Sequence, residues 1–327
     1  EAREMLARAE QRIFSILDNR GTGELANIRD ILQEAMVRID ARMKQEHAVG
    51  GIETGFRDFD TMTGGLHDSE LIILAARPSM GKTALALNIA EHVALASNTA
   101  ALFVSLEMSS VELADRMLCS LAEVNGQRMR NGTISNEDRR KLVEKAAELS
   151  LAPMIVDDTP SRTMTEIAAA ARRLKRKSQL GLVIIDYLQL IEPDNQRDPR
   201  QEQVAKIARR LKGMARELRV PVLCLAQLNR QAEVTRDNRP RLSHLRESGA
   251  IEQDADVVMF IHREEYYESS EEDRAKVAGQ ADLIISKQRN GPIGEVKLAW
   301  LKDITRFRDS SVRPYDEFEQ FNTTSTY

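Results

Sequence analysis

From Gly50 onward, short apolar runs alternate with amphipathic segments, and this alternation restricts the fold more than any other feature. The apolar runs have the length and composition of buried strands: Leu71–Ala76, Ala100–Leu106, Met154–Val156, Leu182–Tyr187, Val222–Ala226, Asp256–Ile261 and Leu283–Ser286. The segments with helical periodicity are Thr83–Ala96, Val111–Val124, Asn136–Leu149, Met164–Lys177 and Gln203–Leu218. Apolar strands separated by helices predict a mainly parallel sheet covered on both faces, and hence an α/β domain over residues 50–311.

A hairpin is predicted near the end of this domain. Asn290-Gly291 lies between two strand-like runs, Asp282–Lys287 and Gly294–Leu301. Asn-Gly is a strong turn signal between strands, because both residues tolerate a positive φ. The following residues, 312–327, are expected to be a frayed tail.

Residues 1–49 lie outside the α/β pattern and are predicted to form a helical linker. Its better apolar stripe, over about 28–44, comprises Ile28, Ile31, Leu32, Ala35, Met36, Ile39 and Met43. Such a stripe must be buried somewhere, either on its own domain or on an adjacent subunit. Flexible segments at both ends favour the second arrangement. Because the chain begins with Glu1 rather than Met, it is expected to be part of a longer protein.

Composition narrows the possible partners. The net charge is −4 and aromatic residues make up 4%, so a nucleic acid would have to be held by a local basic patch rather than by a base-stacking platform. Cys119 and Cys224 fit no metal spacing, and we expect reduced thiols of a cytoplasmic protein. No apolar run approaches the roughly 20 residues that a membrane helix needs, so no membrane partner is expected.

A phosphate-binding motif follows the first apolar run. Residues 76–83 read Ala-Arg-Pro-Ser-Met-Gly-Lys-Thr, which matches the P-loop pattern G-x-x-x-x-G-K-[ST] except for Ala76 at the first glycine. The strand before and the helix after it are the context that a P-loop requires. Backbone amides at the helix start hold phosphates, Lys82 reaches the β- and γ-phosphates of ATP, and the Thr83 hydroxyl ligates Mg²⁺. The nucleotide-binding residues are expected to be Ser79, Met80, Gly81, Lys82, Thr83 and Ala84.

Three polar residues end other apolar runs at the edge where α/β proteins bind ligands. Asp186 is expected to hold Mg²⁺ through water. Glu107 could orient the attacking water, or it could complement the dipole of the following helix. Gln227 could sense the γ-phosphate or act as a capping amide. The residues alone leave the alternatives for Glu107 and Gln227 open.

Several blocks together resemble the C-terminal ATPase domain of bacterial replicative DNA helicases of the DnaB family. They are residues 75–83, Ser105–Ser109 (SLEMS), Ile184–Gln189 (IIDYLQ), Arg246–Asp256 (RESGAIEQDAD) and Lys287–Pro292 (KQRNGP). The resemblance runs from about Gly50 to Phe307. It implies a RecA-like fold, a homohexameric ring, ATP at subunit interfaces, and translocation on single-stranded DNA with unwinding of forked duplex. It also implies primase and a helicase loader as partners, through or near an N-terminal domain that this sequence lacks, and a cytoplasmic, nucleoid-associated protein.

The resemblance also assigns roles to residues. Lys82 and Thr83 serve phosphate and Mg²⁺, Glu107 is the catalytic base, Asp186 is the acid on the metal side, and Gln227 is the sensor amide. Lys287 and Arg289 reach the γ-phosphate bound by the neighbouring subunit, and Arg246, Glu247 and Gly249 contact DNA in the channel.

The residues that act between subunits or on DNA have simpler explanations as well. Lys287 and Arg289 are two apart and so share one side of a strand, as an arginine finger and its companion would, but charges on an edge strand also discourage aggregation. The polar segment Arg236–Gly249, with Arg236, Arg239, Arg241 and Arg246, could follow a phosphate backbone or be an ordinary surface loop. His244 and His262 are expected to be structural, because no ligand spacing surrounds them.

Two other functions fit part of the sequence. A RecA-like recombinase or clock-type ATPase shares the P-loop and Asp186 but does not unwind duplex. A nucleotide-gated scaffold of the loader type would not need Glu107 and Arg289. The blocks at Arg246–Asp256 and Lys287–Pro292 favour the helicase.

Overall fold

The computed structural model describes residues 27–29, 32–33, 36, 50–229, 238–268 and 270–310, with the side chains of residues 246–248 and 250 left out. The chain divides into Glu1–Ala48 and Val49–Tyr327. In the first unit, positions 28, 29, 32, 33 and 36 are helical. The other positions of the expected linker helix, the earlier part of the expected linker and the expected tail 312–327 lie outside the described residues.

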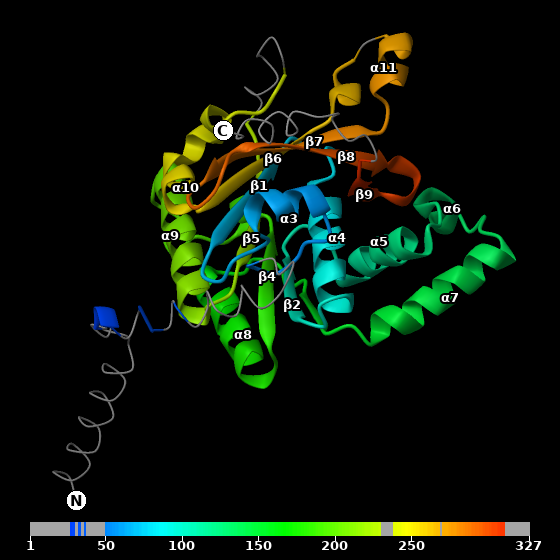
Figure 1. Ribbon diagram of the computed structural model, residues 1–327. Coiled ribbons are helices and arrows are strands. Elements are labelled where there is room, and N and C mark those ends of the chain that lie inside the picture. The colour runs from blue at the N-terminus through cyan, green and yellow to red at the C-terminus, as the bar shows by residue number, and fades with distance from the viewer. Residues whose placement is uncertain are drawn as a thin grey trace, which may run out of the picture. The chain divides into compact units, whose positions relative to one another are not determined.

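The second unit is built on a single mixed sheet. Its strand order is β3-β2-β4-β5-β1-β6-β7-β8-β9 (Figure 1). The parallel strands are β1 (Leu71–Ala76), β2 (Ala100–Ser105), β3 (Met154–Asp157), β4 (Leu180–Asp186), β5 (Val222–Gln227) and β6 (Val257–His262). The antiparallel strands are β7 (Gln280–Gln288), β8 (Gly294–Leu301) and β9 (Arg306–Asp309). The predicted α/β fold and the predicted hairpin are confirmed, although a five-residue loop, 289–293, joins its strands.

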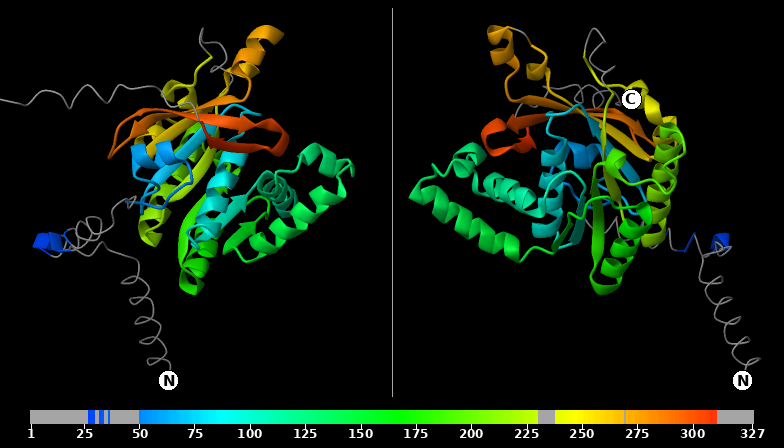
Figure 2. Two further views of the ribbon diagram at one scale, coloured as in Figure 1. Left: turned by 45° about the vertical axis from the view of Figure 1, so that its right-hand side comes forward. Right: turned by 180° about the vertical axis from the view of Figure 1, so that it is seen from behind.

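Helices cover both faces of the sheet. They are α3 (Arg57–Thr63), α4 (Lys82–Leu95), α5 (Ser110–Ala122), α6 (Gly126–Arg130), α7 (Asn136–Ser150), α8 (Met164–Lys177), α9 (Arg200–Leu218), α10 (Gly249–Asp254) and α11 (Glu271–Val277). Helix α4 packs on one face, and α8 and α9 pack on the other (Figure 1). Helices α6 and α7 extend away from the sheet beyond α5 (Figure 2). No described helix has the length and hydropathy to cross a membrane.

Local signals in the sequence explain where several helices begin. Helices α5, α7 and α8 each start with a capping box, in which a hydroxyl residue and an acidic residue three positions later satisfy each other's backbone N–H. The pairs are Ser109 with Glu112, Ser135 with Asp138 and Thr163 with Glu166. Such pairs fix the first turn of a helix and therefore the direction in which the preceding loop leaves the sheet.

The second half of the segment Arg236–Gly249 differs from the nonperiodic loop expected there. Residues Leu242–Ser248 form a 3₁₀ helix, η3, which is kinked at Leu245, and α10 follows directly. Leu245 and Ile251 are buried in the core on the side of α9, and they anchor both turns. Two apolar residues six positions apart were too sparse to reveal this helical structure in the sequence.

Candidate nucleotide site

The P-loop joins β1 to α4 at the carboxyl edge of the parallel strands. Ser79 has φ 67° and Gly81, the N-cap of α4, has φ 99°, so the chain turns sharply into the helix. The side chains of Met80 and Ala84 are buried in the core. These two predicted contacts can therefore offer a phosphate only their backbone amides, as amides at a helix start do.

Gly81 is required for close packing as well as for its backbone angle. A Cβ at this position would lie 2.8 Å from Cζ of Phe307 and 3.3 Å from Cζ3 of Trp300. The rings of Trp300 in β8 and Phe307 in β9 are 4.5 Å apart and support the loop from the antiparallel part of the sheet. The sequence did not indicate this support, because neither aromatic residue belongs to a motif and β9 was not foreseen.

Arg263 is a second residue at the loop that sequence reasoning missed. It follows β6, is 8% exposed, and donates from NH1 to the carbonyl oxygen of Ser79 at 3.1 Å. Its guanidinium lies 4.7 Å from the ring centroid of Trp300 and pairs with Glu265. A buried guanidinium with an acid, an aromatic face and a carbonyl acceptor is held in one orientation, so it fixes the position of the loop.

Thr83, Lys82 and Asp186 meet at the centre of the site. The Thr83 hydroxyl donates to Oδ2 of Asp186 at 2.6 Å, and Lys82 Nζ lies 3.5 Å from Oδ1, which is an ion pair longer than an ordinary hydrogen bond. Asp186 is 1% exposed, and its Oδ1 accepts no hydrogen bond from the described residues. Such an oxygen beside a hydroxyl is the donor chemistry that Mg²⁺ prefers.

Burial dominates the electrostatics of Lys82. Desolvation lowers the pKa of its ammonium group, and the nearby carboxylates of Asp186 and Glu107 oppose that shift. Nζ also lies 4.2 Å above the ring of Tyr187. The buried cation is thus short of negative charge, and triphosphate oxygens would supply it.

Glu107 lies at the same edge of the sheet as Asp186. Ser105 pairs with Asp186 in the β2–β4 register, and the next N–H, of Leu106, donates to the Asp186 carbonyl at 2.8 Å. Glu107 itself is exposed, and no described residue donates a hydrogen bond to its carboxylate. Glu112 completes the cap of α5, so complementing that helix start does not require Glu107.

Gln227 ends β5 at this edge with an exposed side chain. The amide that caps the strand belongs to Gln189, which accepts from the Gln227 N–H at 3.2 Å and donates to its carbonyl at 3.0 Å. The capping role considered for Gln227 is therefore filled by another residue.

Lys287 and Arg289 lie at the amino-terminal ends of the parallel strands, the end of the sheet opposite to the P-loop. Lys287 pairs with Val258 near the start of β6, and the Arg289 N–H donates to the Asp256 carbonyl at 2.9 Å. From Val258, strand β6 runs four residues further to His262, a rise of about 13 Å, before the end of the sheet that carries the P-loop. The β7–β8 ladder ends at Ile285, so Lys287 has a strand partner only in β6, and the alternative of protective charges stays open.

The residues expected to contact DNA fall in η3 and α10. Arg246 and Glu247 are in η3, and Gly249 is the exposed first residue of α10. Arg236 lies outside the described residues. Arg239, in the segment that could follow a phosphate backbone or be an ordinary surface loop, pairs with Asp282 at 2.8 Å and with Glu295.

Both histidines make structural contacts. Nδ1 of His244 accepts from the Arg241 N–H at 3.1 Å, and the His262 ring stacks on Tyr267 with centroids 5.7 Å apart. These contacts agree with the structural roles expected from the sequence.

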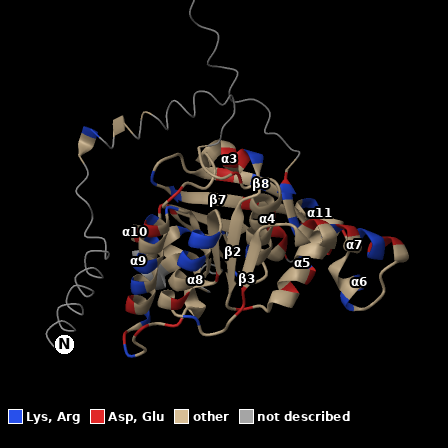
Figure 3. Cartoon of the chain, turned by 90° about the horizontal axis from the view of Figure 1, so that it is seen from below, with Lys and Arg blue, Asp and Glu red and all other residues tan. Residues whose placement is uncertain are grey.

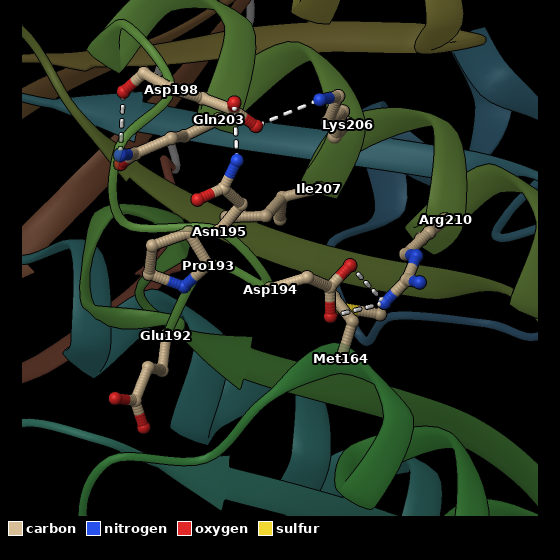
Figure 4. A pocket seen from close by; sticks show the side chains of 10 residues that line it. All are labelled: Met164, Glu192, Pro193, Asp194, Asn195, Asp198, Gln203, Lys206, Ile207 and Arg210. Atoms are coloured by element: carbon tan, nitrogen blue, oxygen red, sulfur yellow. Dashed lines mark hydrogen bonds and ion pairs between the residues drawn. The ribbon is translucent and has the colours of Figure 1, made fainter.

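A small cavity lies between α8, α9 and the loop after β4, and charged side chains that line it pair with one another (Figure 4). Its volume of about 10 Å³ holds roughly one water molecule. Arg210 pairs with Asp194 at 2.7 Å, and Lys206 pairs with Asp198 at 2.7 Å. These ion pairs fasten the loop to α9 and leave no room for a ligand.

Acidic and basic residues are interspersed on several helices of the second unit. In the view of Figure 3 both signs occur along α7, α8 and α9. This mixture agrees with the net charge of −4. Contact with a polyanion would then depend on a short segment rather than on a broad basic face.

A P-loop after β1 and a carboxylate at the end of β4 define a P-loop ATPase, and solved structures give its subclass as RecA-like. One solved ATPase domain matches with a TM-score of 0.79 and 37% identity, over 85% of this chain and 98% of that one. A DnaB-like replicative helicase, from a study of its interactions with primase, matches with a TM-score of 0.79 and 33% identity, over 94% of this chain and 76% of that one.

Sequence comparisons give the family. Residues 51–309 match the DnaB-like helicase C terminal domain. The replicative DNA helicase DnaB of Geobacillus stearothermophilus is 44% identical over 96% of this chain and 68% of its own length. The replicative DNA helicase DnaC of Bacillus subtilis (strain 168) is 43% identical over 94% of this chain and 67% of its own length. The chain belongs to the DnaB-like helicase family: it binds nucleotide and is an ATP-dependent replicative DNA helicase.

Proposed function

We propose that this helicase hydrolyses ATP at sites shared between the subunits of a homohexameric ring. One subunit contributes the P-loop residues Ser79–Ala84 together with Asp186, Glu107 and Gln227. The next contributes Lys287 and Arg289. The observation that carries the proposal is the separation of the two sets of residues within one chain. The P-loop lies at the carboxyl ends of the parallel strands, and Lys287 and Arg289 lie at their amino ends. This separation of each cation from its own P-loop supports a site in which the cation is contributed by another subunit.

Each group in the shared site has a distinct task. The P-loop amides and Lys82 bind the β- and γ-phosphates, and Thr83 and Asp186 would hold Mg²⁺, which would neutralise phosphate charge. Glu107 orients the attacking water and accepts its proton, and Gln227 contacts the γ-phosphate. Arg289, with Lys287 beside it, stabilises the charge that develops on the transferred phosphoryl group.

The same ring would move along single-stranded DNA. Arg246, Glu247 and Gly249 of each subunit face DNA in the channel, and backbone contacts there need no base readout. Loss of the γ-phosphate releases the neighbour's Arg289 and loosens that interface, so the DNA-binding segment moves with its subunit. Sequential hydrolysis around the ring makes the motion directional.

Segment 1–49 would serve as the linker, with residues 50–311 as the motor and 312–327 as a tail. The linker helix over about 28–44 docks on an adjacent subunit. Support comes from Ile28, Leu32 and Met36, which follow one stripe and are 65%, 57% and 56% exposed. Primase and a loader are proposed partners, in a nucleoid-associated complex. One similar solved structure concerns a DnaB-like helicase and primase.

Two substitutions test the shared site. Arg289→Ala should leave ATP affinity unchanged and lower kcat by about 10³-fold, because it removes only an interaction made with the transferring phosphoryl group. Arg140→Ala, an exposed arginine on α7, is the matched control and should have no effect. Turnover near wild type in the Arg289→Ala protein would contradict the proposal.

A forked-duplex assay separates the helicase from a recombinase-like ATPase. The wild-type protein should displace the strand of a forked duplex in an ATP-dependent reaction. Hydrolysis stimulated by single-stranded DNA without strand displacement would favour the recombinase-like alternative.

A further inference from the structure

Lys287 and Arg289 close the C-terminal end of helix α10. Lys287 Nζ donates to the carbonyl oxygens of Ala255, at 2.7 Å, and of Glu252. NH2 of Arg289 donates to the carbonyl oxygen of Gln253. Glu252 and Gln253 lie in the last turn of this six-residue helix and Ala255 follows it directly; the helix's own N–H groups leave such carbonyls unsatisfied, and cations are favourable there.

Asp256 holds Arg289 from the other side. Its carboxylate is buried, with Oδ1 3.5 Å from NH1 of Arg289. Its Oδ2 accepts from the N–H of Leu71, at 2.7 Å, and from Nζ of Lys212, at 2.6 Å. The carboxylate is therefore fixed to β1 and α9, and Arg289 rests against a rigid partner.

One side of Arg289 remains available to a neighbouring molecule. Its side chain is 44% exposed, although the guanidinium contacts both Gln253 and Asp256. A guanidinium has five N–H donors in a rigid plane, so contacts on one side aim the others outward. The loop 289–293 that carries it is therefore oriented by α10 and Asp256 rather than by the hairpin alone.

Helix α10 is continuous with the DNA-facing segment. Arg246 and Glu247 lie in η3, which ends at Ser248, and Gly249 begins α10. Between Gly249 and the capped carbonyls there is about one and a half helical turns. A shift of this short, rigid helix along its axis would move the acceptors that hold Lys287 and Arg289.

We propose that Asp256 and the C-terminal carbonyls of α10 position Arg289 and Lys287, and that α10 thereby links DNA contact in one subunit to hydrolysis in the neighbouring subunit's site. This inference rests on the proposed function, because it takes Arg289 as the finger and Arg246–Gly249 as the DNA contact. Coupling between the sites is reciprocal in binding: DNA orients the finger, and nucleotide at the neighbour changes DNA affinity.

Three variants test the positioning role: Asp256→Asn, Lys212→Gln and the double variant. Asparagine keeps an acceptor for the Leu71 N–H but loses the charge that faces Arg289 and Lys212. The double variant also removes Lys212, so that this lysine is not left without the carboxylate that it pairs with in the wild type. Each is assayed for kcat with and without single-stranded DNA, and for the Kd values of ATP and of single-stranded DNA.

We expect DNA-stimulated kcat to fall about tenfold in Asp256→Asn and in the double variant, with the Kd of ATP measured without DNA and the Kd of DNA measured without nucleotide each within about twofold of wild type. Lys212→Gln should retain wild-type stimulation. Wild-type stimulation in the double variant would overturn the proposal, since Asp256 would then serve only to neutralise Lys212. Arg289→Ala distinguishes failure of the shared site from failure of the positioning role. Normal turnover in Arg289→Ala refutes the shared site. Loss of turnover in Arg289→Ala together with normal DNA stimulation in the double variant refutes only the positioning role of Asp256.

Discussion

Gly81→Ala adds one methyl group where backbone angle and packing both oppose it. At φ 99° an alanine costs about 1–2 kcal/mol relative to glycine. The methyl would also lie 2.8 Å from Phe307 Cζ, and overpacking of this kind costs about 1–3 kcal/mol. Together these terms predict a loss of about 2–5 kcal/mol in the free energy of unfolding.

Gly132→Ala is the matched control for that prediction. Gly132 has φ 67°, but its Cβ would meet no heavy atom within 4 Å, so only the backbone cost applies. Unfolding in urea at fixed protein concentration, followed by circular dichroism, gives both values. The fluorescence of Trp300, the only tryptophan, reports on the packing near Gly81, because its ring lies beside Phe307.

The difference between the two variants isolates the steric part. The loss in the free energy of unfolding should be about 1–3 kcal/mol larger for Gly81→Ala than for Gly132→Ala. In a double-mutant cycle, Phe307→Leu should recover part of that difference. Equal losses in the two alanine variants, with no coupling to Phe307, would refute the reasoning about the aromatic support.

Three further outcomes are expected. Arg263→Met should raise KM for ATP about tenfold and change kcat little, because the P-loop loses its anchor at Ser79; steady-state kinetics would contradict this if KM were unchanged. Burial raises the pKa of the thiols of Cys119 and Cys224, so at pH 8 both remain protonated and react slowly with a disulfide reagent until the protein unfolds; native labelling at the rate of a free thiol would argue against it. Glu107→Gln should bind ATP normally and fail to hydrolyse it, as phosphate release would show, and brisk hydrolysis would exclude Glu107 as the base.

Local patterns in the sequence were sufficient to locate the parallel part of the fold. Strand β1 and helix α8 have the predicted bounds, and β2, β4 and β5 differ by one or two residues at their ends. These elements are continuously apolar or strongly periodic. Lys82, Thr83 and Asp186 were brought together by the same logic, because carboxyl ends of parallel strands share one edge.

The support of the P-loop could not be predicted in this way. Arg263 follows β6, and Trp300 and Phe307 come from β8 and β9, so their place beside the loop depends on strand order rather than on local pattern. Strand β9 is four residues long with three charged side chains, so its sequence carries no apolar alternation. The contacts of Lys287 and Arg289 with the end of α10 could not be predicted either, because their acceptors are backbone carbonyls, which every residue has.

Mixing two inactive proteins tests the shared site most directly. Glu107→Gln lacks the base but retains Arg289, and Arg289→Ala lacks the finger but retains Glu107. After dissociation and reassembly of an equal mixture, roughly a quarter of randomly formed interfaces should join an intact P-loop subunit to an intact finger donor. DNA-stimulated hydrolysis should therefore reappear in the mixture. A mixture that stays as inactive as its two components, in rings shown to have exchanged subunits, would contradict the account.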